Sequence, residues 1–133
     1  MAWVTTGAQL KQRVGKMTDI NRGDILLVNL EPTIGSEQRG KSRPCLVVSP
    51  KELNDVFRGI IVCPVTDAKH LKQSELGLTL LPAGEGGLDK DSLVVAFQLR
   101  MIDKRRVIRK LGSISDSFFL EVNESLRAVL DLS

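Results

Sequence analysis

Short apolar runs bounded by glycine and proline are the feature that most constrains the fold of this chain. Two of them, at residues 25–30 and 45–48, have the length and β-branched content of strands, and they flank a polar loop. The loop contains Pro32, Gly35 and Gly40 and is too polar to belong to a core. Strands that hold a charged, glycine-containing loop form a rigid base for a working surface, so we expect function here.

The whole chain contains six such runs and one segment of helical periodicity. The predicted strands span residues 24–30, 45–49, 59–65, 78–81, 92–99 and 107–111. Proline cannot donate to a ladder, so we expect pairing to begin after Pro44 and to stop at Pro64. Residues 51–58 are interpreted as a polar connection, residue 102 begins a turn, and 104–106 form one helical turn or a tight loop. From residue 115 to 132, apolar residues recur every three or four residues, which predicts a helix with Ser115 as its N-cap. The pattern predicts a mainly β, partly open barrel with a C-terminal α-helix packed on it.

Length and charge set further bounds. The 133 residues predict one domain, at 20–133, preceded by a leader, 1–19, that is a short helix or a flexible tail. No run of about 18 apolar residues occurs and the N-terminus lacks an apolar signal segment, so a cytoplasmic protein is expected. Three of the 19 basic residues lie in the acid-free segment 1–16, and the other 16 balance the 16 acidic ones. Whole-domain basicity therefore does not indicate nucleic-acid binding, and only local clusters count.

The residues that commonly bind metals are few. Cys45 and Cys63 each lie in an apolar run, which favours buried, inert thiols over a disulfide. His70 has no second histidine or cysteine at ligand spacing. We expect neither a metal site nor a cofactor.

The densest basic cluster is Lys104-Arg105-Arg106 with Arg109 and Lys110. It is either a solvated rim or a surface that follows phosphates. Aromatic residues are scarce, and Phe57 is the one loop aromatic available to stack on a base. Base selection would then depend on polar loop groups that contact base edges.

Several spaced motifs together carry a family resemblance. Along residues 20–132 they are Arg22-Gly-Asp, Pro32-Thr33, Gly35-Ser36-Glu37-Gln38, Gly40, Arg43-Pro44, Leu46-Val47-Val48-Ser49-Pro50, Val62-Cys63-Pro64-Val65-Thr66, Asp91-Ser92, Gln98-Leu99-Arg100-Met101-Ile102-Asp103 and Leu111-Gly112. In this order they resemble the signature of the MazF/PemK-type toxins of toxin–antitoxin systems.

The resemblance implies a homodimeric SH3-like barrel that is an endoribonuclease, an mRNA interferase. Such enzymes cleave single-stranded RNA at specific sequences without a metal. The 2′-hydroxyl attacks phosphorus and leaves a 2′,3′-cyclic phosphate and a 5′-hydroxyl. The resemblance also implies an antitoxin partner whose acidic tail occupies the RNA groove.

The resemblance also assigns residues. The catalytic arginine falls on Arg43, the catalytic threonine on Thr66 and the loop glutamate on Glu37. RNA-binding positions expected around them are Ser36, Gln38, Arg39, Lys41, Lys69, His70 and Gln98. Some members carry an arginine and an aspartate where this chain has Val95 and Phe97, so an Arg–Thr pattern is expected here.

The chemistry of these side chains is compatible with that assignment. Arg43 offers a planar fork of donors that matches phosphate geometry, and because arginine stays protonated we expect electrostatic stabilisation rather than acid catalysis. Thr66 supplies a hydroxyl donor, and Glu37 is either the base or an organiser of the loop. Two alternatives remain at this point: a non-enzymatic toxin of the same fold that poisons DNA gyrase, and an RNA-binding barrel that does not cleave.

Overall fold

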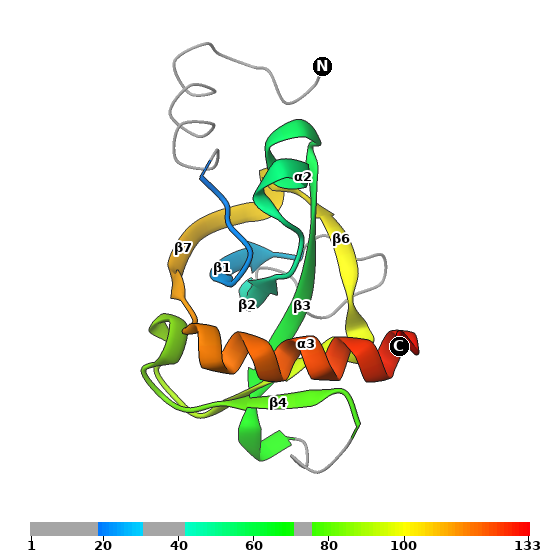
Figure 1. Ribbon diagram of the computed structural model, residues 1–133. Helices are drawn as coiled ribbons and strands as arrows, with labels where there is room; N and C mark the ends of the chain where they lie inside the picture. The colour runs from blue at the N-terminus through cyan, green and yellow to red at the C-terminus, as the bar shows by residue number, and fades with distance from the viewer. Residues whose placement is uncertain (1–18, 31–41, 71–75) are drawn as a thin grey trace, which may run out of the picture.

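The computed structural model describes residues 19–30, 42–70 and 76–133, and these form a strongly twisted sheet crossed by one long helix (Figure 1). The seven strands are β1 Asp24–Asn29, β2 Ser42–Val47, β3 Gly59–Asp67, β4 Leu78–Leu81, β5 Ser92–Val95, β6 Arg100–Asp103 and β7 Val107–Ser113. The helices are α2 Lys51–Val56 and α3 Asp116–Leu130, with 3-10 turns η1 Ala68–His70, η2 Glu85–Gly87, η3 Ala96–Gln98 and η4 Lys104–Arg106. All pairings are antiparallel, in the order β4-β5-β3-β2-β1-β7, with β6 beside β3. The sheet is not closed, which confirms the predicted mainly β, partly open fold with a C-terminal helix. The predicted helix in the leader lies outside the described residues.

Strand β3 connects the two halves of the sheet because it changes partner along its length. Its first half pairs with β6 from Gly59↔Asp103 to Val62↔Arg100, and its end pairs with β5 from Val65↔Val94 onward. The prediction that Pro64 ends pairing was wrong. Pro64 lies between the β6 and β5 ladders, where a strand tolerates a missing N–H donor.

Strand β2 begins earlier than expected, at Ser42, and Pro44 lies within it. Pro44 is opposite Leu27 of β1, whereas the ladder with β3 begins one residue later, at Cys45↔Pro64. Pro44 therefore has a strand neighbour on one side only, and its missing donor is accommodated as at a sheet edge.

Two further elements differ from the sequence prediction. The predicted strand at 92–99 is interrupted by η3, and β6 lies where a turn was expected. The predicted polar connection at 51–58 contains α2, which carries an i,i+4 ion pair between Lys51 and Asp55. The helical turn at 104–106 and the strand at 78–81 are confirmed.

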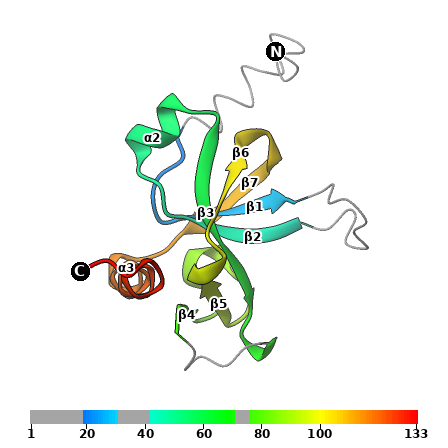
Figure 2. The same ribbon diagram turned by 90° about the vertical axis from the view of Figure 1, so that its right-hand side faces the viewer.

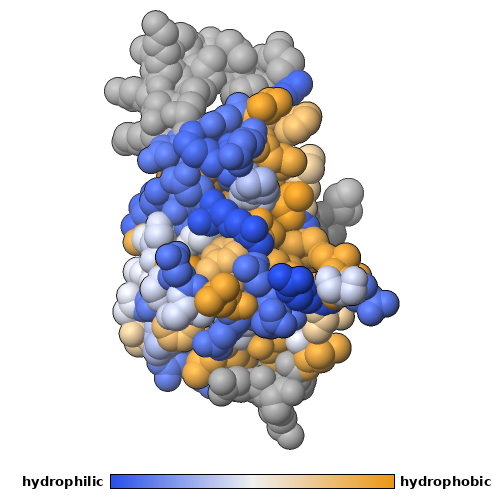
Figure 3. All heavy atoms as spheres, viewed as in Figure 1, coloured by the Kyte–Doolittle hydropathy of each residue, from blue (hydrophilic) through white to orange (hydrophobic). Residues whose placement is uncertain are grey.

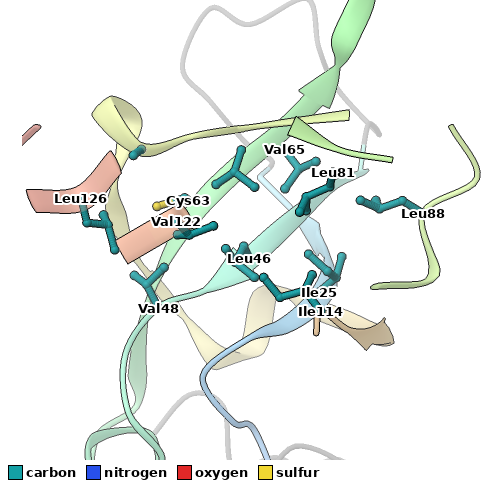
Figure 4. Close-up of a cluster of buried hydrophobic side chains, with 12 residues drawn as sticks. Ile25, Leu46, Val48, Cys63, Val65, Leu81, Leu88, Ile114, Val122 and Leu126 are labelled. Carbon is teal, nitrogen blue, oxygen red and sulfur yellow. The ribbon is translucent and has the colours of Figure 1, made fainter. Parts of the chain in front are cut away.

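The core consists of two main clusters on opposite faces of β1, β2 and β3. The first, drawn in Figure 4, joins this sheet to β4, β5 and α3, with Val122 and Leu126 of α3 pointing into it. The second lies between the sheet and β6, β7 and Ile20. Cys63 belongs to the first cluster and Cys45 to the second, and both are buried and free, as predicted.

Helix α3 is fixed at its N-terminal half by residues far away in sequence. Ser115 is its N-cap, as predicted, but its hydroxyl makes no capping bond, and the Ser115 N–H donates to the carboxylate of Glu85. The Arg22 guanidinium donates to Asn123 Oδ1 at 2.7 Å and lies 4.7 Å from the centre of the Phe119 ring. Within the described ranges, no helix is long and apolar enough to cross a membrane.

Candidate active site

The two predicted catalytic residues lie on neighbouring strands. Arg43 is exposed on β2, opposite Val28 of β1, and Thr66 is half-buried on β3, opposite Leu93 of β5. The β2–β3 register pairs Cys45 with Pro64, and its continuation by two residues would place Arg43 across from Thr66. Residues two apart on a strand share a face, so Arg43 shares the face of Cys45 and Thr66 shares that of Pro64. Their backbone positions therefore direct both side chains to the face that carries Cys45 and Val62.

The Cys45 thiol lies beneath this surface. Burial raises the pKa of Cys45 to about 12, and the positive charges of Arg100 and Arg43 act in the opposite direction. Both guanidinium groups therefore act on one buried thiol, from β6 and from β2. Arg100 was not predicted as a site residue, because its side chain can be placed on this face only once β6 is recognised as a strand.

The end of β3 is fixed by a short network around Asp67. The Lys69 N–H donates to Asp67 Oδ1 at 3.0 Å, and the Nζ atoms of Lys90 and Lys69 lie 3.4 and 4.0 Å from Oδ2. The hydrogen bond from Lys69 and the two lysine charges hold the pKa of Asp67 below its usual value, although partial burial acts against them. The predicted RNA-binding residue Lys69 is exposed and lies in η1, directly after the strand that carries Thr66. His70 is the last residue of that turn.

The other predicted RNA-binding residues divide into two groups. Gln98 is exposed in η3, at the junction of β5 and β6 beside β3. The loop residues Ser36, Gln38, Arg39 and Lys41 lie outside the described part of the chain, as does Glu37, the third predicted catalytic residue. The described residues that flank the loop include the pair Asn29↔Ser42, and Ser42 directly precedes Arg43.

The basic cluster at 104–110 is partly committed to the fold. Lys110 Nζ lies 3.1 Å from Oδ2 of the buried Asp24, and Arg105 pairs with Asp103 at 3.1 Å. Phe57 is exposed, but it precedes β3 and so lies at the opposite end of this strand from Thr66. Among the residues that the structure describes, no group of three or more His, Cys, Asp or Glu side chains is placed to hold a metal ion.

The fold and this surface define a small β-barrel-like protein with an arginine and a threonine on adjacent strands. The family model for PemK-like, MazF-like toxins of type II toxin–antitoxin systems matches residues 21–130. The chain belongs to this family.

Named relatives agree with this assignment. The Endoribonuclease MazF of Staphylococcus epidermidis is 33% identical over 114 residues, which cover 86% of this chain and 93% of the relative. Endoribonuclease EndoA of Bacillus subtilis (strain 168) is 32% identical over 85% of this chain and 96% of its own length. The Deinococcus radiodurans MazE–MazF crystal structure (Form-II) matches with a TM-score of 0.70 and 29% identity, over 86% of this chain and 97% of that one. The predicted family and the predicted enzyme class, an endoribonuclease, are confirmed.

Proposed function

We propose that this chain is the toxin of a toxin–antitoxin pair and cleaves single-stranded mRNA at specific sequences. The observation that carries the proposal is the placement of Arg43 and Thr66 on one face of adjacent strands. In the reaction, the ribose 2′-hydroxyl attacks the adjacent phosphorus and the 5′-oxygen of the next nucleotide leaves. The products are a 2′,3′-cyclic phosphate and a 5′-hydroxyl. A substrate of this kind places its action in the cytoplasm.

Each residue has a defined part in this proposal. The phosphorane carries extra negative charge on its non-bridging oxygens, and preorganised donors aimed at those oxygens lower the barrier. Arg43 would supply a bidentate fork, and Thr66 a hydroxyl donor, without a metal ion. Glu37 would accept the 2′-hydroxyl proton or organise the loop. Lys69, Gln98 and the loop residues would contact phosphates and base edges.

The gyrase-poison alternative is not favoured. It requires no arginine–threonine pair on a shared face, and the named relatives that match this chain are endoribonucleases. A supercoiling assay would show inhibition of gyrase if that alternative held.

We also propose that the protein acts as a two-fold homodimer. The outward side of β6 and of η3 carries exposed apolar residues: Met101 is 69% exposed and Phe97 48% exposed. Met101 is opposite the partly buried Ile61 of β3, and Figure 3 shows apolar surface along the side formed by α2, β3 and β6. A second copy of the chain would remove this surface from water.

Light scattering at micromolar concentration should give twice the chain mass for the wild type and a lower mass for Met101→Lys. A monomeric wild type would refute the dimer.

A cognate antitoxin with an acidic tail is the second partner we propose. Exposed cations on the site face, Arg43 and Arg100, offer charge complementary to such a tail. A mycobacterial endoribonuclease of the same fold has been solved in complex with its cognate antitoxin. A peptide with the antitoxin's acidic tail should then compete with RNA for the protein.

The central experiment is cleavage of a long transcript by the purified protein in the presence of EDTA. Primer extension should map cuts to a recurring short sequence, and the upstream fragments should end in cyclic phosphates. Random degradation, dependence on a divalent cation or the absence of any cleavage would each contradict the proposal. Arg43→Ala, purified in parallel, controls for contaminating nucleases, because a contaminant would cleave equally in both preparations.

A further inference from the structure

Arg100 is the first residue of β6 and lies opposite Val62 of β3. Its neighbour two positions along, Ile102, belongs to the buried cluster that also contains Val62 and Cys45. Residues two apart on a strand share a face, so Arg100 is directed to the same face as Cys45. This is also the face to which Arg43 and Thr66 belong.

Strand β3 separates the two arginines. At Val62 it pairs with β2 through Val47 and with β6 through Arg100, so β2 and β6 flank it (Figure 1; Figure 2 shows the same strands turned by 90°). Arg43 lies two residues before Cys45 on β2, and Thr66 lies two residues after Pro64 on β3. Along the strands, Arg43 and Thr66 therefore lie on one side of the Cys45↔Pro64 pair and Arg100 lies on the other.

The Arg100 side chain is exposed and has no hydrogen bond or ion pair within residues 19–30, 42–70 and 76–133. Other cations in this region differ: Arg105 is held by Asp103 and Lys110 by Asp24. The Arg100 charge nevertheless acts on the buried Cys45 thiol, as does that of Arg43. Two positive charges therefore lie over one apolar surface, an arrangement that favours an anionic ligand.

The spacing suggests that the two arginines contact different phosphates. Along the strand direction their Cα atoms are four residues apart, at about 3.3 Å per residue. Across the sheet they are two strands apart, at about 4.8 Å per strand. That separation exceeds the size of a single phosphate group, whereas a single-stranded backbone presents one negative charge per nucleotide.

We infer that Arg100 binds an RNA phosphodiester other than the one on which Arg43 acts. This inference rests on the proposed function. It makes Arg100 a binding residue and not a catalytic one. Its contribution is present in the bound substrate as well as in the transition state, so its loss should raise KM and leave kcat nearly unchanged.

The test is RNA binding measured by fluorescence anisotropy across a salt series. The probe is a labelled, random-sequence, single-stranded 2′-O-methyl RNA pool, which lacks the attacking hydroxyl and is not consumed. Arg100→Ala should weaken binding about tenfold, and the slope of log affinity against log salt should become shallower by about 0.7. Arg100→Lys should recover most of the affinity, because a point charge suffices for a phosphate contact that requires no fork.

Arg127→Ala is the matched control. Arg127 is an exposed arginine on α3 whose ion pair, within the part of the chain that the structure describes, is to Glu124 of the same helix. Its loss removes the same charge at a distance from the site and should leave the affinity and the salt slope unchanged. Because Arg100 and Arg127 are both exposed, both variants should melt close to the wild type.

The outcomes separate this inference from the proposed function. Equal affinity and slope in Arg100→Ala and Arg127→Ala would overturn the inference, even if the wild type cleaves RNA. If Arg100→Ala weakens RNA binding but the wild type does not cleave unmodified RNA, the inference is supported and the proposed function is contradicted. A wild type that does not bind the pool at all would overturn the inference directly.

Discussion

Asn54 is the buried polar residue whose loss should affect stability most. It lies in α2 with only 1% of its surface exposed. Its Nδ2 donates to the carbonyl oxygens of Ile20 at 2.9 Å and of Ser49 at 3.1 Å, and its Oδ1 accepts from the Ser49 hydroxyl at 2.5 Å. One amide thus joins the segment before β1 to Ser49, two residues after β2, and to α2.

The expected loss of stability follows from the partners that Asn54→Ala leaves behind. The Ser49 hydroxyl has an alternative acceptor, the Ile61 carbonyl at 3.5 Å, but the carbonyl oxygens of Ile20 and Ser49 lose the Asn54 donor. A buried group left without a partner costs about 1–3 kcal/mol, so the two together lower the free energy of unfolding by about 3 kcal/mol. For a chain of this size we expect a fall in Tm of about 10 °C.

Thermal and urea unfolding followed by circular dichroism measure this change. Asp55→Ala is the control on the same helix, since it removes only an exposed ion pair with Lys51 and should shift Tm by no more than about 2 °C. If Asn54→Ala and Asp55→Ala melt at the same temperature, the anchoring role assigned to the amide is wrong.

Three further predictions concern the site, the thiols and a glycine contact. Arg43→Ala should lower kcat by about 10²–10³ or more and Thr66→Ala by about 10², with little change in RNA affinity. Arg43→Lys should also have a low kcat, because a lysine cannot form the bidentate contact of a guanidinium group. Near wild-type turnover in Arg43→Lys would contradict the role of that bidentate contact. Burial raises the pKa of Cys45 and Cys63 to about 12, so the native protein should not react with a thiol reagent at pH 8.5, whereas titration near the ordinary thiol value would contradict their burial. Because the pKa of each thiol is raised by folding, the free energy of unfolding that the two thiols contribute is complete below their pKa in the unfolded chain and is lost as the pH rises towards about 12. Urea unfolding between pH 8 and 11 should show this loss. In Gly112→Ala the new Cβ would lie 2.7 Å from the Gly86 carbonyl carbon, so unfolding should become easier by about 2 kcal/mol; a melting temperature equal to that of the wild type would show that the backbone yields there.

Much of the fold could be predicted from the sequence because local pattern and tertiary context agree. The apolar runs that became β1, β3, β4 and β7 are bounded by glycine or proline, and the period of three and four residues identified α3. The errors arose where tertiary context overrides local rules. Pro44 and Pro64 were expected to limit pairing, yet each lies where one neighbouring ladder is absent, which sequence alone does not reveal. Helix α2 has six residues and no apolar period, and it depends on the buried Asn54 contacts.

The candidate site was predictable in part for the same reason. Motif order indicated Arg43 and Thr66, and the register places them on adjacent strands; their catalytic roles remain predictions. Arg100 was missed because β6 was interpreted as the end of the preceding strand and a turn. Once β6 begins at Arg100, alternation with the buried Ile102 fixes its face. The signal was present in the sequence, but the interruption by η3 concealed it.

The two prolines lie where the sheet changes its pairing, next to the proposed site. The β2–β3 ladder ends at Cys45↔Pro64, so beyond it β2 pairs only with β1, while β3 turns to β5. Arg43 and Thr66 lie just past that end, on strands that no longer share a ladder. A continued ladder would hold opposite Cβ atoms about 5 Å apart and leave little room for a ligand between them. Under the proposed function, the end of the ladder just before Arg43 and Thr66 would leave room for a phosphate between β2 and β3, and the ladder from Cys45↔Pro64 onward would hold both residues in position.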